Sequence, residues 1–153
     1  MNKRIRKTSW VVLITLIAIQ LIPIDTSNPV EDSADTFLTA TSPDDEVRSI
    51  LNKACMDCHS FNTVYPWYSH IAPISWWLVD HIDEGREHLN LSTWAQYDAK
   101  KKDHKLEEFA EEVEEHEMPL NSYTWMHPEA RLTEEQRGLL VDWVKKIRAE
   151  KTY

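Results

Sequence analysis

The sequence Cys55-Met56-Asp57-Cys58-His59 is the motif from which the fold and the ligand site of the chain are predicted. C-x-x-C-H is the attachment signature of a c-type haem. Two thiols separated by two residues can reach the two vinyl groups at one edge of a porphyrin, and each can add across a vinyl group to give a thioether. His59 is then left beneath the ring, with an imidazole nitrogen available as proximal ligand of the iron. The motif predicts one covalent haem c, held through Cys55 and Cys58.

Two other kinds of site use a C-x-x-C pair, a structural zinc site and a thioredoxin-like redox site. Zinc normally needs a second ligand pair, but these are the only 2 cysteines in the chain, so histidines or carboxylates would have to complete the site. A redox-active pair usually opens a helix in a βαβ unit. Here the pair closes a helical pattern and no strand pattern flanks it. A haem-free thiol-disulfide or zinc protein is therefore the second alternative.

Composition limits the fold and the partners. The chain has 153 residues with 7 Trp and only 2 Gly, which favours helices around a large flat ligand over a sheet with tight turns. Residues 1–24 contain Lys3, Arg4, Arg6 and Lys7 and no acid, so the remainder carries 13 basic and 26 acidic residues. This acidity argues against nucleic acid as a ligand. It favours redox partner proteins with a basic or neutral surface.

The N-terminus has the pattern of an export element. Residues 1–7 form a basic n-region, and residues 8–24 contain the apolar run WVVLITLIAIQLI. The segment would rise only about 25 Å as a helix against a hydrocarbon core of about 30 Å, which fits a signal peptide. No Ala-x-Ala-like cleavage site follows, however. We therefore predict a single-pass signal anchor in the inner membrane, with the N-terminus inside and the domain on the periplasmic side of the bacterial cytoplasmic membrane.

A flexible linker is predicted for residues 25–43, and a folded domain for residues 44–153. Ser42 is a candidate N-cap and Pro43 suits the first turn of a helix. Apolar residues then recur at helical spacing up to the motif: they are Val47, Ile50, Leu51 and Ala54. A helix that runs directly into C-x-x-C-H resembles the N-terminal helix of small class I cytochromes c.

An aromatic segment follows the motif. Residues 61–77 contain six aromatic residues and two prolines. We interpret the segment as the proximal wall of a haem pocket, although plain core packing is as compatible with any one ring. A carbonyl near Pro66 or Pro73 would accept from the second nitrogen of His59. The candidate pocket residues are Tyr65, Trp67, Tyr68 and Trp77.

Several stretches resemble one family, the haem-binding domain family of small exported bacterial proteins related to c-type cytochromes. They are the C-x-x-C-H-Ser run, YPWYS at 65–69, PISWWL at 73–78 and HIDEGR at 81–86. The similarity extends over about residues 45–147. The resemblance implies an all-helical domain with one haem.

Two more helices follow in the pattern, over 74–91 and from about Asp98 to Glu117. Gly85 lies inside the first helix, where glycine costs about 1 kcal/mol relative to alanine, so a close neighbour or the haem edge is expected beside it. His81 and His88 are expected to be ordinary helix-face histidines. The second helix is rich in glutamate, which we interpret as a solvated face that can also guide a cationic partner.

Met118-Pro119 follows the charged helix and resembles the distal-ligand loop of class I cytochromes c. Met118 is the predicted sixth iron ligand, and Pro119 stiffens its loop. His/Met ligation raises the reduction potential relative to two histidines. The rival ligands are Met126, His127 and His116.

The last predicted helix begins at a capping box, Thr133 with Gln136. We expect it to cross the helix that precedes the motif, with Trp143 nearby and Gly138 or Ala54 at the close contact. The fold prediction is an all-α, small class I cytochrome-c-like domain preceded by an N-terminal transmembrane or signal-anchor helix.

The predicted function is one-electron transfer without substrate chemistry, because protein ligands at His59 and Met118 leave no open position on the iron. The first alternative is a haem enzyme or a gas or redox sensor, which requires a vacant or labile distal site.

Overall fold

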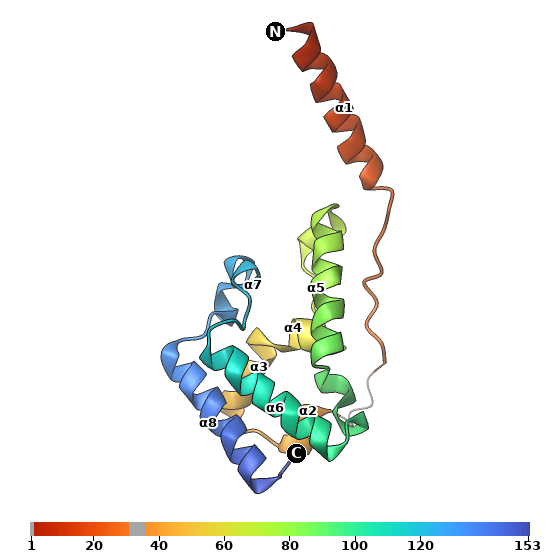
Figure 1. The fold of residues 1–153 in the computed structure, drawn as a ribbon. Helices are drawn as coiled ribbons and strands as arrows, with labels where there is room; N and C mark the ends of the chain where they lie inside the picture. Colours follow the sequence, from red (N-terminus) through yellow and green to blue (C-terminus); the bar gives the residue numbers. More distant parts are fainter. Residues whose placement is uncertain (1, 31–35) are drawn as a thin grey trace.

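The computed structural model describes residues 2–30 and 36–153, and within them the chain is helical and contains no strand (Figure 1). This confirms the all-α prediction. Helix α1 projects away from a body built from the later helices, and the C-terminus ends beside α8. The α-helices are α1 (Lys3–Ile19), α2 (Phe37–Thr41), α3 (Asp45–Ala54), α4 (Met56–His59), α5 (Ile74–His88), α6 (Ala99–Glu114), α7 (Asn121–Met126) and α8 (Glu134–Glu150). The 3-10 helices are η2 (Trp67–His70), η3 (Leu91–Gln96) and η4 (Pro128–Ala130).

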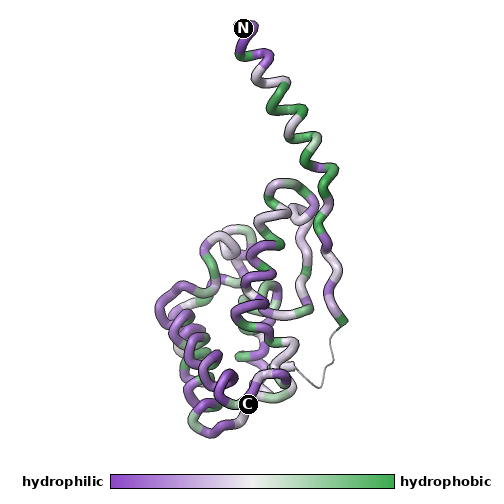
Figure 2. Tube along the Cα trace, turned by 45° about the vertical axis from the view of Figure 1, so that its right-hand side comes forward, coloured by the Kyte–Doolittle hydropathy of each residue, from purple (hydrophilic) through white to green (hydrophobic). Residues whose placement is uncertain are grey.

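The predicted transmembrane anchor is wrong. None of the described helices is both long enough and apolar enough to cross a bilayer. Helix α1 has 17 residues, so it rises about 25 Å, and its first turns contain the four basic residues of the n-region. Figure 2 shows the change from hydrophilic to hydrophobic residues along it. The helix ends at Ile19, and the side chain of the next residue, Gln20, bonds the backbone of Ala72 in both directions, at 2.9 and 3.0 Å.

The main core lies where α6 and α8 pack along each other, with α3 and η3 against them. The apolar stripes predicted for these helices face one another there, and burying such side chains supplies most of the driving force for folding. Phe37 packs edge-on against Trp94, with ring centroids 4.8 Å apart. The most buried large side chains of this core are Trp94, Phe37, Leu51, Leu91, Leu106, Leu140, Val47 and Val144.

The ordered body begins earlier than the predicted domain boundary at residue 44. Phe37 is only 1% exposed and α2 lies within the span predicted as linker, because an aromatic ring in that span joins the core. Ser42 does not cap α3 but ends α2 in a left-handed conformation, and Asp44 is the N-cap, accepting from the Val47 N–H. Residues 31–35 of the linker lie outside the described residues.

Helix α8 starts as predicted but packs differently. The capping box of Thr133 and Gln136 is present. The helix touches α3, but it packs mainly along α6, so the expected crossing over the pre-motif helix is a minor contact. Gly138 has no atom within 4 Å of an added Cβ, and Trp143 packs on Phe37. The prediction of a crossing over α3 failed because the spacing of apolar residues shows which face of α8 is buried but not which helix covers that face.

Helix α5 packs against α4, and Gly85 is the reason it can come so close. A Cβ at this position would lie 2.9 Å from the carbonyl oxygen of Cys58 and 3.3 Å from its Cβ. The neighbouring Arg86 donates from Nε to the Ser60 carbonyl at 2.9 Å. The expected close approach at Gly85 is confirmed, and the neighbour is the backbone of the motif itself.

The two glycines of the chain give a matched pair of tests. Gly85→Ala forces a backbone carbonyl to move, so we expect it to destabilise the fold by about 1–3 kcal/mol. Gly138→Ala adds a methyl group in open space within a helix, and should stabilise by about 0.5–1 kcal/mol. Urea unfolding followed by circular dichroism measures both. A Gly85→Ala protein as stable as the parent would contradict the close packing.

Candidate functional site

A cavity of about 570 Å³ opens between the motif, α5 and α6. Its volume is within the range of about 300–1,000 Å³ typical of small-molecule and cofactor sites. Cys55, Cys58 and His59 line one part of it, and Met118 lines another. Its apolar lining comes mainly from Leu89, Phe109, Val113, Pro119, Leu120 and Leu132. The structure therefore brings the four strongest candidate residues to one cavity.

The motif forms a break between two helices. Helix α3 ends at Ala54, Cys55 leaves the helical conformation with φ −124°, and α4 begins at Met56. The His59 N–H then closes the short helix on the Cys55 carbonyl at 2.9 Å. Met56 points into the core, whereas both cysteines are free, half-buried and at the cavity.

His59 is held by the end of α5. Its Nδ1 lies 2.9 Å from the Gly85 carbonyl oxygen and 3.0 Å from that of Leu89. Carbonyl oxygens only accept, so Nδ1 carries the proton and donates. Burial lowers the pKa of His59, which favours the neutral ring. The lone pair is therefore on Nε2, the nitrogen that a metal would use. The prediction of a carbonyl near Pro66 or Pro73 as the partner of this ring is wrong.

The cysteines do not have the environment of a redox-active pair. Burial raises the pKa of Cys55 to about 12 and that of Cys58 to about 11. A catalytic C-x-x-C pair lowers the pKa of its attacking thiol, and zinc binds thiolates. Among the described residues, neither cysteine belongs to a group of three or more metal-binding side chains. Both observations disfavour the haem-free alternatives.

Met118 is fixed at its backbone by two elements. Its N–H donates to the Glu112 carbonyl at 3.0 Å, which caps the end of α6. Its carbonyl accepts from Arg137 Nη1 at 2.7 Å, and the same Nη1 lies 2.9 Å from the Val113 carbonyl. The side chain is half-buried and lines the cavity. An arginine of α8 thus holds the start of the loop beside α6.

The three rival ligands lie elsewhere. Met126 is 54% exposed and does not line the cavity. His127 also lies outside the lining, and its Nε2 is 2.8 Å from the Tyr68 hydroxyl. His116 is exposed, with Nε2 2.9 Å from a Glu134 oxygen. Of the four candidates for a sixth ligand, Met118 alone is among the cavity residues.

The aromatic residues proposed as the pocket wall are not in the cavity lining. Trp67 is 70% exposed, and Trp77 is 44% exposed with its ring 4.1 Å from that of His81. Tyr68 is buried in a separate small cluster with Leu78 and Ile82, against which Tyr65 packs. The segment does contact the motif, because Cys58 packs on this same cluster, but it does so outside the cavity. Residue spacing could not reveal on which side of the motif the aromatic rings pack.

Other lining residues were not singled out from the sequence as site residues. Phe109 and Val113 belong to an apolar stripe of α6 that extends from the core to the cavity. Tyr123 lines the cavity from α7 and has a hydrogen bond to Asp57, inside the motif. The carbonyls of α5 carried no sequence signal beyond lying at a helix end, where acceptors are unpaired.

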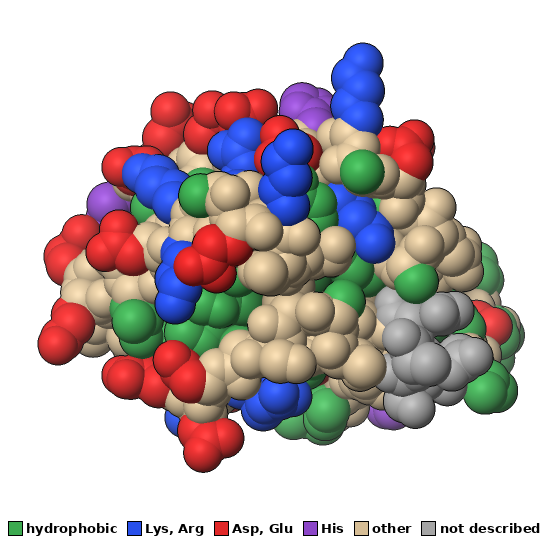
Figure 3. Space-filling model, turned by 90° about the horizontal axis from the view of Figure 1, so that it is seen from below, with side chains coloured by type: hydrophobic (Ala, Val, Ile, Leu, Met, Phe, Trp, Pro, Cys, Tyr) green, Lys and Arg blue, Asp and Glu red, His purple; other side chains and the backbone are tan. Residues whose placement is uncertain are grey.

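Ionisable side chains surround the cavity. They come from α5 and α6, and they are His81, Glu84, His88, Lys105, Glu108, Glu111 and Glu112. Lys105 is paired with Glu108 at 2.6 Å, so acidic groups dominate this rim. Figure 3, which views the molecule from below, shows acidic side chains along one edge with lysines and arginines among them.

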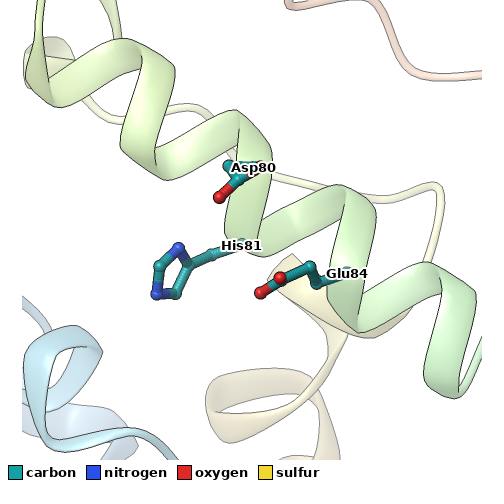
Figure 4. Close-up of side chains that lie close together, drawn as sticks. All are labelled: Asp80, His81 and Glu84. Carbon is teal, nitrogen blue, oxygen red and sulfur yellow. The ribbon is translucent and has the colours of Figure 1, made fainter.

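A cluster of metal-ligand type lies on α5 beside this rim. The ligand atoms of Asp80, His81 and Glu84 all lie within 4.8 Å of one another (Figure 4). His81 Nδ1 donates to the Trp77 carbonyl at 2.9 Å, which leaves Nε2 with its lone pair. Two of the three side chains are exposed carboxylates, and such groups gather on many acidic surfaces. The cluster therefore does not by itself identify a metal site.

Comparison with known proteins gives one finding. A family model described as a haem-binding domain matches residues 14–146. No curated protein and no solved structure gives a significant match. The matched span contains every residue that lines the cavity.

Proposed function

The chain belongs to the haem-binding domain family, and on this premise we propose that its cavity holds one covalent haem c and that the protein carries single electrons between redox partners. The family resemblance expected from the sequence is confirmed over residues 14–146. Haem binding follows from the family. Covalent attachment, His/Met ligation and electron transfer are the proposal.

The residues of the cavity fit a haem. The walls are largely apolar, with a neutral imidazole and a thioether among them, and both of these are iron ligands in haem proteins. One observation carries the proposal most strongly, the pairing of His59 Nδ1 with the Gly85 and Leu89 carbonyls at 2.9 and 3.0 Å. It orients the ring and leaves Nε2 to bind a metal, as backbone partners do for metal-binding histidines generally.

The two thiols support covalent attachment. Cys55 and Cys58 are unpaired and lie at the same cavity as His59. Each thiol would add its S–H across one vinyl group, forming a carbon–sulfur bond without consuming an oxidant. Protonated thiols, which their raised pKa values favour, carry the hydrogen that this addition requires.

Met118 supports an electron carrier over an enzyme. When bound, the haem supplies an iron that alternates between ferrous and ferric states. His59 and Met118 would both bind the iron, so in a peroxidase or gas sensor the peroxide or gas would first have to displace the Met118 thioether. The backbone contacts of Met118 to Glu112 and Arg137 oppose such a displacement. Apolar walls keep water away, which reduces the rearrangement that accompanies a change in charge.

The acidic rim suggests the kind of partner. Glu84, Glu108, Glu111 and Glu112 stand at the cavity with Lys105 as the one lysine or arginine among the lining residues. A negative field around a redox centre attracts cationic partners and accelerates their encounter. We therefore expect a redox protein with a basic surface at this side of the molecule.

Attachment is tested by maturing the protein with the haem-attachment machinery. We expect the mass to rise by one haem, and the reduced, denatured protein to show the spectrum of a haem with two thioethers. Cys55→Ala or Cys58→Ala should leave one thioether, and the double variant should release all haem into acidified acetone. A colourless parent protein, or haem extractable from it, would contradict covalent attachment.

Distal ligation is tested by Met118→Ala with Met126→Ala as its matched control. Loss of the thioether should abolish the far-red sulfur-to-iron band, lower the reduction potential and allow rapid binding of carbon monoxide. Met126 is exposed and outside the cavity, so its substitution should change none of these properties. A band that survives in Met118→Ala would disprove the assignment.

The rim is tested with two small oxidants of opposite charge. The ferrous protein should react with the cation tris(phenanthroline)cobalt(III) several-fold more slowly as the ionic strength rises from about 0.01 to 0.1 M, because the Debye length falls from about 30 to 10 Å. The rate with the anion ferricyanide should rise instead. Glu111→Gln with Glu112→Gln should weaken both trends, whereas Glu135→Gln with Glu150→Gln, on α8 outside the cavity, should matter less. Equal salt dependence for both oxidants would exclude an acidic docking site.

A further inference from the structure

A hydrogen bond joins the middle of the C-x-x-C-H motif to α7. The hydroxyl of Tyr123 donates to Oδ2 of Asp57, with an oxygen–oxygen distance of 2.6 Å. Asp57 stands between the two cysteines, and its Oδ1 accepts from the Val64 N–H at 3.0 Å. Such a short bond to a carboxylate is typical of the strong, charge-assisted class.

The Tyr123 hydroxyl keeps its proton over the physiological pH range, so it remains a hydrogen-bond donor. Burial, followed by the hydrogen bond and the charge of Asp57, raises the pKa of Tyr123. The ring is also fixed from the side, because it stacks on His127 with centroids 4.4 Å apart and 15° between the planes. The hydroxyl is therefore a preorganised donor.

Helix α7 depends on such side-chain contacts for its position. It has 6 residues, and Thr124 is the one buried among them. Trp125 is 76% exposed and Met126 54% exposed, and the main packing partner of α7 is the short η4. A single isolated helical turn is unstable in water, so contacts to other elements must hold it.

The same contact lies at the end of the loop that carries Met118. Tyr123 closes a turn on that loop through its N–H to the Leu120 carbonyl at 3.0 Å. The start of the loop is held by Arg137 and by the end of α6, at the Met118 backbone. Residues 118–123 thus form a segment with two anchors, one on α6 and α8 and one on the motif, and both Met118 and Tyr123 line the cavity.

We propose that Asp57 and Tyr123 are positioning residues that hold the segment 118–123 against the attachment motif, so that the Met118 sulfur stays at the iron. This inference rests on the proposed function, because it takes Met118 as the distal ligand. Neither residue touches the iron in this role. Asp57 joins the covalent anchor of the haem to the opposite end of the loop that supplies the other axial ligand.

The experiment measures the rate at which carbon monoxide binds to the ferrous holoprotein, since binding requires the thioether to leave. Tyr123→Phe removes the hydroxyl and keeps the ring, and Asp57→Ala removes the acceptor. Each should accelerate binding about tenfold, the size expected for a lost hydrogen bond to a charged group. The double variant should be no faster than the singles, because both remove the same bond. Tyr68→Phe is the control, since it removes the hydroxyl partner of His127 and leaves the bond to Asp57 in place.

A second measurement separates positioning from general destabilisation. In Tyr123→Phe, the far-red sulfur-to-iron band should be lost at lower denaturant than the helical circular dichroism, whereas the two transitions of the parent and of Tyr68→Phe should stay closer together. A shift of both transitions by the same amount would reduce the role to ordinary stability and overturn the inference.

The outcomes distinguish this inference from the function it rests on. If the parent binds carbon monoxide as fast as Met118→Ala, Met118 is not a ligand and both proposals fail. If the parent binds slowly and Tyr123→Phe and Asp57→Ala match the Tyr68→Phe control, the positioning role fails alone. Effects that simply add in the double variant also overturn it.

Discussion

The contact between the C-x-x-C-H motif and the C-terminal half of α5 is the constraint on which the site depends. Because Gly85 has no side chain, α5 lies so close to the motif that a Cβ at this position would be only 2.9 Å from the Cys58 carbonyl oxygen. At that distance the Gly85 and Leu89 carbonyls reach His59 Nδ1, and Arg86 reaches the Ser60 carbonyl. A side chain at position 85 would push the helix away and release the imidazole. One missing Cβ therefore determines the orientation of the imidazole whose Nε2 is proposed to bind the iron.

The opposite wall of the cavity is held by a separate set of contacts. Helices α6 and α8 pack along each other, and Arg137 crosses from α8 to the carbonyls of Val113 and Met118. The guanidinium thereby ties the end of α6, at the Val113 carbonyl, to the start of the loop, at the Met118 carbonyl. The loop with Met118 is thus set by the α6–α8 pair, whereas His59 is set by α5. The two candidate axial ligands belong to different packing units.

The parts of this arrangement that the sequence predicts are those encoded locally. The motif, the capping box at Thr133, the tight position of Gly85 and the loop at Met118 follow from residue type and spacing, and the structure places each of them as expected or at the cavity. The predictions that were wrong concern which surfaces of the elements pack against one another. Trp67 and Trp77 are exposed and do not line the cavity, and α8 covers α6 more than α3. A carbonyl partner for His59 has no residue-type signature, because every residue has the same acceptor.

The error over residues 8–24 has a different origin. The sequence already indicated a helix of only about 25 Å, and an anchor was predicted because no cleavage site follows the apolar run. The helix ends at Ile19, and the next side chain, that of Gln20, pairs with the Ala72 backbone. A polar residue near the end of the run thus finds a partner within the folded chain, and the apolar sequence beyond it is not helical. Composition over a window cannot register where such a tertiary contact stops a helix.

The position of the motif between two apolar clusters explains why a ligand in the cavity matters to the whole fold. Cys55 packs against the large cluster of α3, α6 and α8, and Cys58 packs against the small one of Tyr68, Leu78 and Ile82. The buried apolar side chains of α5 are Leu78 and Ile82 of the small cluster, whereas Ile74 and Trp77 are exposed. The cavity is lined mainly by residues of the large cluster, such as Phe109 and Leu89, and Cys58 is the lining residue that packs on the small one. A ligand that fills it therefore adds apolar contacts that neither cluster provides, and binding to the folded state alone stabilises that state. Attachment through both cysteines would make that stabilisation permanent, because the ligand could no longer leave when the two clusters separate.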